Sequence, residues 1–197
     1  NALDFRIAHR FGNIGSALGG GFQNLYGLDN VADVRISFDY GITENIQVGV
    51  ARNKVNRIYE LNGKWRFMRQ TTNNKRPVTL AYFFAGGIAS DRNYTVPGST
   101  ELYYKDFSSR LSYVHQLIVA RKFGEWVSLE LLPTYIHRNL VEQHNYGTDE
   151  NAFFALGFAG RVRLSRRVAI IADYFLPFSN FRNGAPYADA IGNQVNY

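Results

Sequence analysis

The chain has no cysteine and few charged residues, which make up 19% of its 197 positions. Without cysteine, it cannot form a disulfide framework or a thiolate-based metal or redox centre. Nowhere does it contain 18 consecutive apolar residues, so no transmembrane helix is expected within these residues. The sequence therefore points away from cysteine-stabilised scaffolds and from helical membrane spans.

Aromatic residues are abundant, with 13 tyrosines and 15 phenylalanines. Such an excess is typical of a large aromatic core or of the aromatic belts at a membrane interface. The net charge is +6, but the cations are scattered, and they form no cluster beyond pairs such as Arg166–Arg167. A nucleic-acid partner is therefore not expected.

Apolar and polar residues alternate along most of the sequence, which is the pattern of β-strands. Tyr59, Leu61 and Trp65, for example, share one parity, and Glu60 and Lys64 share the other. The pattern predicts about nine strands and no convincing helix, so we expect a single all-β domain over residues 1–197. The predicted strands cover roughly residues 3–11, 34–40, 46–51, 59–68, 78–88, 111–119, 127–135, 154–164 and 168–176.

The connectors between these strands alternate in length, with residues 53–56 as one short exception. Bacterial outer-membrane barrels have short periplasmic turns and long outer loops, so the rhythm predicts an antiparallel up-and-down transmembrane β-barrel in the bacterial outer membrane. The short connectors are residues 41–45, 71–77, 123–125 and 165–167, and the long ones are 12–30, 90–106, 138–151 and the segment after 178.

The two faces of the strands differ in polarity, and we expect the apolar face to contact lipid. The other face carries many charges, and burying them in a small soluble core would cost on the order of several kcal/mol for each unpaired ion. A soluble barrel with an aromatic core is the alternative. Side chains expected to face lipid are Leu61, Trp65, Leu80, Leu129, Leu156 and Ile170. Two aromatic girdles are expected, one with Tyr40, Trp65, Phe67, Phe123 and Trp126 and the other with Tyr59, Tyr103, Tyr104, Tyr135, Phe153 and Tyr174.

The polar face would line a lumen in which cations outnumber anions. We expect Arg35, Arg66 and Arg110 to lie near the strand centres or the outer mouth, where they would favour anions. In the alternative interpretation they pair with Asp39, Glu60 and Glu130 and plug the barrel. The expected inward cations are Arg6, Arg10, Arg35, Lys64, Arg66, Arg110, Arg161 and Arg163, and the anions are Asp4, Asp39, Glu60, Glu130 and Asp173.

Two residues do not fit a plain lipid-facing strand. His115 has the outward parity near the middle of a strand, where a polar group is costly in lipid, so that face either contacts a partner protein or is shifted by a bulge. Pro133 cannot donate a hydrogen bond to a neighbouring strand, so a bulge or locally broken pairing is expected there.

Strand counting predicts that further strands follow residue 197 in the full protein. If the first strand rises from the periplasm, the ninth rises too and ends outside the cell. Closed single-chain bacterial barrels have even strand numbers, so we expect about twelve strands in all.

Four sequence words support the same fold. They are HRFG at residues 9–12, YGLDN at 26–30, FDYGI at 38–42 and VGVAR at 48–52. Together they resemble an uncharacterised family of bacterial outer-membrane β-barrels, a domain of unknown function. The resemblance implies a barrel and an outer-membrane location, and it brings no catalytic or ligand residues.

The expected function is that of a scaffold or accessory subunit of an envelope complex, with the lipid bilayer, lipopolysaccharide and envelope proteins as partners. A small-solute channel with anion preference is one alternative. An outer-membrane lipid-modifying enzyme is another, but no serine or aspartate has a motif spacing to His9, His115, His137 or His144. No catalytic residue, metal site or cofactor is therefore predicted.

Overall fold

Nine antiparallel strands form one sheet in the computed structural model, which describes residues 2–11, 22–27, 29, 31–96, 98, 100–141, 143–144 and 147–179. Each strand pairs with its neighbours in sequence order, so the predicted meander is confirmed. The strands are β1 (Leu3–Phe11), β2 (Val31–Gly41), β3 (Ile46–Asn53), β4 (Ile58–Met68), β5 (Thr79–Ala89), β6 (Leu111–Phe123), β7 (Val127–Arg138), β10 (Ala152–Arg163) and β11 (Ala169–Phe178). A separate small hairpin, β8 (Gln143–His144) and β9 (Gly147–Thr148), lies between β7 and β10.

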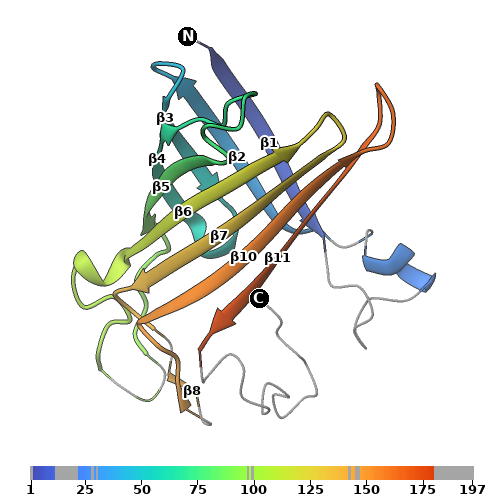
Figure 1. The fold of residues 1–197 in the computed structure, drawn as a ribbon. Coiled ribbons are helices and arrows are strands. Elements are labelled where there is room, and N and C mark those ends of the chain that lie inside the picture. The colour runs from blue at the N-terminus through green and yellow to red at the C-terminus, as the bar shows by residue number, and fades with distance from the viewer. Residues whose placement is uncertain are drawn as a thin grey trace.

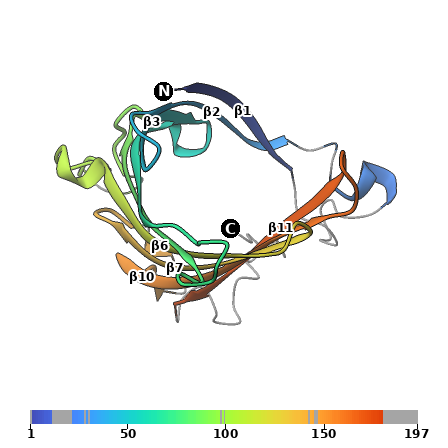
Figure 2. The same ribbon diagram turned by 45° about the horizontal axis from the view of Figure 1, so that its top comes forward.

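The sheet curls into a curved wall around a central space (Figures 1 and 2). Within the described residues, β1 pairs only with β2 and β11 only with β10. The wall is therefore an open half-barrel with β1 and β11 as its two margins. That about twelve strands close the full barrel stays a prediction.

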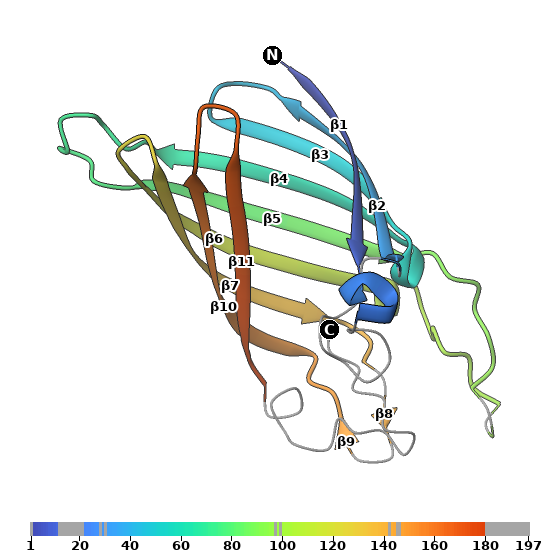
Figure 3. The ribbon, with the colours of Figure 1, turned by 90° about the vertical axis from the view of Figure 1, so that its right-hand side faces the viewer.

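The connectors lie in two groups, one at each end of the strands (Figure 3). At the short-turn end lie residues 42–45, 69–78, 124–126 and 164–168. At the long-loop end lie the described parts of the longer connectors, which are residues 22–27, 29, 90–96, 98, 100–110, 139–141, 143–144 and 147–151. The predicted exception also lies at the long-loop end, where β3 and β4 are joined by Lys54 and the 3-10 helix η2 (Val55–Arg57). The other helices of the described ranges are η1 (Phe22–Gly27) and η3 (Ser108–Arg110), and none is long and apolar enough to span a bilayer.

The outer face of the wall is apolar, as the alternation predicts. Leu61, Trp65, Leu129 and Ile170 are each at least half exposed, and Leu80 and Leu156 on the same face are partly exposed. On the inner face, by contrast, polar side chains such as Ser37, Asn62 and Thr134 are buried. This is the reverse of a soluble barrel, because the apolar side chains point away from the enclosed space.

Gly49 shows why the inner face needs small residues. A Cβ atom at Gly49 would lie 2.1 Å from Asp39 Oδ1 and 2.8 Å from Asn62 Oδ1. Both distances are shorter than any real contact, and both neighbours belong to the strands that flank β3. Glycine therefore makes room for polar side chains from two neighbouring strands.

The girdle predictions hold better at one end than at the other. Trp65, Phe67, Phe123 and Trp126 are exposed near the short turns, and Tyr59 and Tyr174 are exposed toward the long loops. Three other aromatic residues of the second group, Tyr103, Tyr104 and Phe153, instead line a cavity at the long-loop end. Their girdle assignment was wrong for two physical reasons. Strand pairing with Ile136 puts Phe153 on the inner face, and the two tyrosines belong to a loop, where strand parity does not apply.

Pairing between β6 and β7 is interrupted at Pro133, as predicted. Gln116 pairs with Thr134 and Val119 with Leu131, but no residues pair between these two positions. The register is the same on both sides of the gap, so the wall has no bulge there. On its other side Pro133 pairs with Leu156 of β10, which leaves the missing N–H on the β6 side.

Candidate functional site

A charged cluster covers the inner face of β1 to β4, around a cavity of about 430 Å³. Arg35 of β2 and Glu60 of β4 form an ion pair there, and the Asn62 amide donates a hydrogen bond of 3.1 Å to the same Glu60 oxygen. The two charged side chains are largely shielded from solvent, with exposed fractions of 25% and 16%. Residues lining this inner cavity include Asp4, Arg6, Arg35, Asp39, Asn62 and Lys64.

Asp39 and Glu130 lie on the inner face without an arginine partner in the described part of the chain. Asp39 packs beside Gly49 and lines the inner cavity, while Glu130 is exposed on β7. Of the three acids considered as plugs, Glu60 alone is paired with an arginine among the described residues.

Arg66 lies at the short-turn end rather than near the strand centres or the outer mouth. Its guanidinium donates to the Glu44 carbonyl at 2.6 Å and to Asn45 Oδ1 at 3.2 Å. Both acceptors belong to the turn between β2 and β3, so Arg66 holds that turn against β4.

Arg110 lies at the opposite end, in η3 immediately before β6. Its Nη1 atom donates to the carbonyl oxygens of Ala89, at 3.0 Å, and Asp91, at 2.8 Å. Its guanidinium also lies 3.9 Å from the centre of the Tyr104 ring. Arg110 therefore anchors the β5–β6 loop and places a positive charge at the long-loop end.

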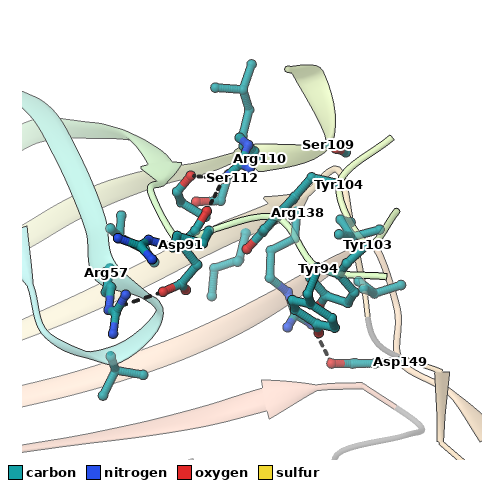
Figure 4. Close-up of a pocket in the computed structure, with 18 of the residues that line it drawn as sticks. Arg57, Asp91, Tyr94, Tyr103, Tyr104, Ser109, Arg110, Ser112, Arg138 and Asp149 are labelled. Atoms are coloured by element: carbon teal, nitrogen blue, oxygen red, sulfur yellow. Dashed lines mark hydrogen bonds and ion pairs between the residues drawn. The ribbon is translucent and has the colours of Figure 1, made fainter. Parts of the chain in front are cut away.

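A cavity of about 720 Å³ opens beside Arg110, and we call it the mouth cavity (Figure 4). Strand ends supply Arg138 and Phe153, and η2 supplies Arg57. Asp149 comes from the connection between β9 and β10, and the loop between β5 and β6 supplies the rest of the charged and aromatic lining. Its charged residues are Arg57, Asp91, Arg92, Arg110, Arg138 and Asp149, and its aromatic residues are Tyr94, Tyr103, Tyr104 and Phe153.

Two ion pairs cross the mouth cavity. Arg57 Nε lies 3.3 Å from Asp91 Oδ1, and Arg138 Nη2 lies 2.5 Å from Asp149 Oδ2. The second pair is shielded, since the Asp149 side chain is only 7% exposed. Each of these carboxylates is thus matched by one arginine.

The loop that frames the mouth cavity is held by its own acids. Asp106 accepts hydrogen bonds of 2.8 Å from the Ser109 backbone N–H and from the Ser108 hydroxyl, and these contacts lower the pKa of Asp106. Lys105 lies 2.7 Å from Glu101, and its hydrogen bond and charge lower the pKa of Glu101. Both acids are therefore ionised at neutral pH, and Asp106 fixes the start of η3, which carries Arg110.

Much of the mouth cavity was not anticipated from the sequence. Arg57, Arg92, Arg138 and Tyr94 were not singled out, because three of them follow no strand period. For Arg138 a signal did exist, since it shares the parity of Glu130 and Thr134 on β7 and so belongs to the inner face.

His115 projects from the outer face of β6 into a group of rings. Its Nδ1 atom lies 2.5 Å from the Tyr82 hydroxyl, and ring centres of Phe84 and Tyr135 lie 5.1 and 6.2 Å away. The Nδ1 atom of His115 thus has its hydrogen-bond partner on a neighbouring strand of the same sheet. Whether a partner protein covers it stays a prediction.

A curled antiparallel wall with an apolar outside and a charged inside defines a membrane-embedded β-barrel. The family model described as "Membrane bound beta barrel domain (DUF5777)" matches residues 1–196, so the chain belongs to this family of unknown function. The resemblance inferred from the sequence words is thereby confirmed at the level of the family. Neither the curated proteins nor the solved structures include a match to the chain.

Proposed function

We propose that the protein is an outer-membrane barrel that passes small solutes through its lumen and prefers anions. The observation that carries this proposal is the surplus of cations on the inner face. By strand register, this face bears Arg6, Arg10, Arg35, Lys64, Arg66, Lys122, Arg138, Arg161 and Arg163 against Asp4, Asp33, Asp39, Glu60, Glu130 and Asp173.

Local pairing neutralises only part of this surplus. Arg6 pairs with Asp4 and Arg35 with Glu60 on the strands β1 to β4, and Arg138 of β7 pairs with Asp149. Within the described ranges, Lys64 and Arg161 have no carboxylate within ion-pair distance. Rings of unmatched Arg and Lys raise the local concentration of anions in a pore, which supports passage of anions over cations.

The architecture supports a location in the bacterial outer membrane. In bacteria, transmembrane barrels of this kind belong to the outer membrane, with short turns on the periplasmic side and long loops outside. The long-loop end, with the mouth cavity, would then face the exterior.

Planar-bilayer recording of the full-length protein under a salt gradient tests the proposal. We expect a reversal potential on the anion side that shrinks as salt screens the fixed charges. Arg161→Gln should reduce the anion preference, while Arg167→Gln, in the short turn, serves as the matched control. A cation-selective reversal potential, or no conductance at all, would contradict the proposed function.

The outward polar group at His115 favours a second candidate, a subunit that docks in an envelope complex. A hydrogen-bonded His–Tyr pair on a lipid-facing surface is unusual, since polar groups at that depth are costly in lipid. Native purification with mass spectrometry tests this candidate. A partner lost from the Tyr82→Phe/His115→Leu variant supports docking, and a partner-free wild type contradicts it.

A further inference from the structure

We infer that the mouth cavity is a binding site for a small solute that carries an oxyanion on a ring. A volume of about 720 Å³ lies in the range of small-molecule sites, roughly 300–1,000 Å³. It is built on the ends of β6, β7 and β10 and on η2 and η3, so a rigid sheet supports part of its lining (Figure 4).

The charges of the mouth cavity leave room for an anion. Its two aspartates are each engaged by one arginine, Asp91 by Arg57 and Asp149 by Arg138. Arg92 and Arg110 have no carboxylate partner among the described residues, so two positive charges stay unmatched.

Hydrogen bonds among the described residues hold the Arg110 guanidinium in place but occupy only one of its three nitrogen atoms. Its Nη1 atom donates to the carbonyls of Ala89, at the end of β5, and of Asp91, while its Nε and Nη2 atoms have no hydrogen-bond partner in the described ranges. The Nε atom of Arg138 is also buried without a partner there. A guanidinium with free N–H groups in a fixed orientation suits the paired oxygens of a carboxylate or phosphate.

The tyrosines provide a surface for a ring. Tyr94 and Tyr103 are stacked, with ring centres 4.9 Å apart and planes inclined by 13°. Tyr94 is still 50% exposed, and Tyr104, which lies against Tyr103, carries the Arg110 guanidinium on its face. The exposed Tyr94 ring and the Arg110 guanidinium therefore line the same cavity, and one ligand can contact both.

The arginines and the tyrosine rings together indicate which class of ligand fits the mouth cavity. An inorganic anion would use the arginines alone, and a neutral sugar would use the rings alone. A sugar acid or a sugar phosphate would use both groups, and its oxyanion would form the stronger, charge-assisted contacts. Binding at equilibrium does not require conduction, so this inference can fail or hold independently of the proposed channel.

Isothermal titration calorimetry on the full-length protein in lipid nanodiscs tests the inference. The probes are D-glucuronate, D-glucose 6-phosphate, D-glucose and acetate. We expect one or both ring anions to bind about tenfold more tightly than either control probe. D-glucose lacks the charge-assisted hydrogen bonds and acetate lacks the ring contact, and each of these contacts is worth up to roughly that factor. The order of the two ring anions identifies the preferred oxyanion.

Variants separate the two halves of the site. Arg92→Gln and Arg110→Gln should each weaken the ring anion about five- to tenfold, and Tyr94→Leu should weaken the ring anion while leaving acetate unchanged. Because Arg110 anchors its loop, Arg92→Gln is the variant that tests charge without disturbing the fold. Arg167→Gln at the short-turn end is the control. The inference would be overturned if neither ring anion binds more tightly than acetate, or if Arg92→Gln leaves the binding of the tighter ring anion unchanged.

Discussion

The two faces of the wall each contain a polar pair, but the pairs differ in kind. On the inner face, Arg35 and Glu60 are both charged, and Glu60 also accepts a hydrogen bond from the Asn62 amide. On the outer face, Tyr82 and His115 form one hydrogen bond and are otherwise surrounded by aromatic rings. The inner pair belongs to a charged surface, and the outer pair is a polar exception on an apolar surface.

The difference shows which solvent each face meets. Charges on the inner face can be hydrated or paired, so the surplus of cations there is tolerated. On the outer face, lipid offers no hydrogen-bond partner, and a polar group must find one within the sheet. Three substitution experiments can break or sharpen this contrast.

The largest effect on stability is expected from a charge placed on the outer face of β10, and the matched substitution on its inner face should cost much less. Phe158 is 45% exposed on the outer face, whereas the next residue, Ala159, pairs across the inner face with Glu130 and Asp173. Phe158→Arg should cost about 2–4 kcal/mol, the usual penalty for arginine near the bilayer midplane, while Ala159→Arg should cost less than about 1 kcal/mol. Reversible denaturant unfolding in lipid vesicles measures both, and equal costs would contradict the assignment of the faces.

An intermediate effect is expected for the inner ion pair. Glu60→Gln should destabilise the fold by about 1 kcal/mol, because the Arg35 side chain is still 25% exposed and its charge can be hydrated when Glu60 is neutral. It should also increase anion selectivity, and Arg35→Gln should decrease it. A double-mutant cycle on stability isolates the pair itself, and a coupling energy near zero would show that the pair does not stabilise the wall.

The smallest net effect is expected when the outer pair is removed completely. Tyr82→Phe and His115→Leu should each cost up to about 1 kcal/mol, because each leaves a polar partner in lipid. The double variant should be nearly neutral, since both polar groups are then gone. If the double variant is as unstable as the sum of the two single variants, the pair has a role beyond mutual hydrogen bonding.

The strands and their faces could be predicted because the sequence repeats with the period of a pleated strand. Leu61 and Trp65 alternate with Glu60 and Lys64, and lipid outside with water inside imposes that same alternation on the structure. The same parity also assigns Phe153 to the inner face, although its position near a long loop suggested a girdle.

The mouth cavity could not be predicted in the same way. Tyr94, Tyr103 and Arg92 belong to a loop, and a loop has no repeating geometry from which the direction of a side chain follows. Arg110 was recognised as an inner cation, but its anchoring depends on the carbonyls of Ala89 and Asp91, which come close only after folding. Residue type identified the charge, and the tertiary structure determined its role.

The interruption at Pro133 makes the wall mechanically uneven. Elsewhere along the seam between β6 and β7, cross-strand hydrogen bonds share any load, but between Gln116 and Val119 no paired residues carry it. Strands β1 to β6 on one side and β7, β10 and β11 on the other are thus joined by a seam with a local weak point. A force that separates β6 from β7 would therefore concentrate its deformation in this unpaired stretch.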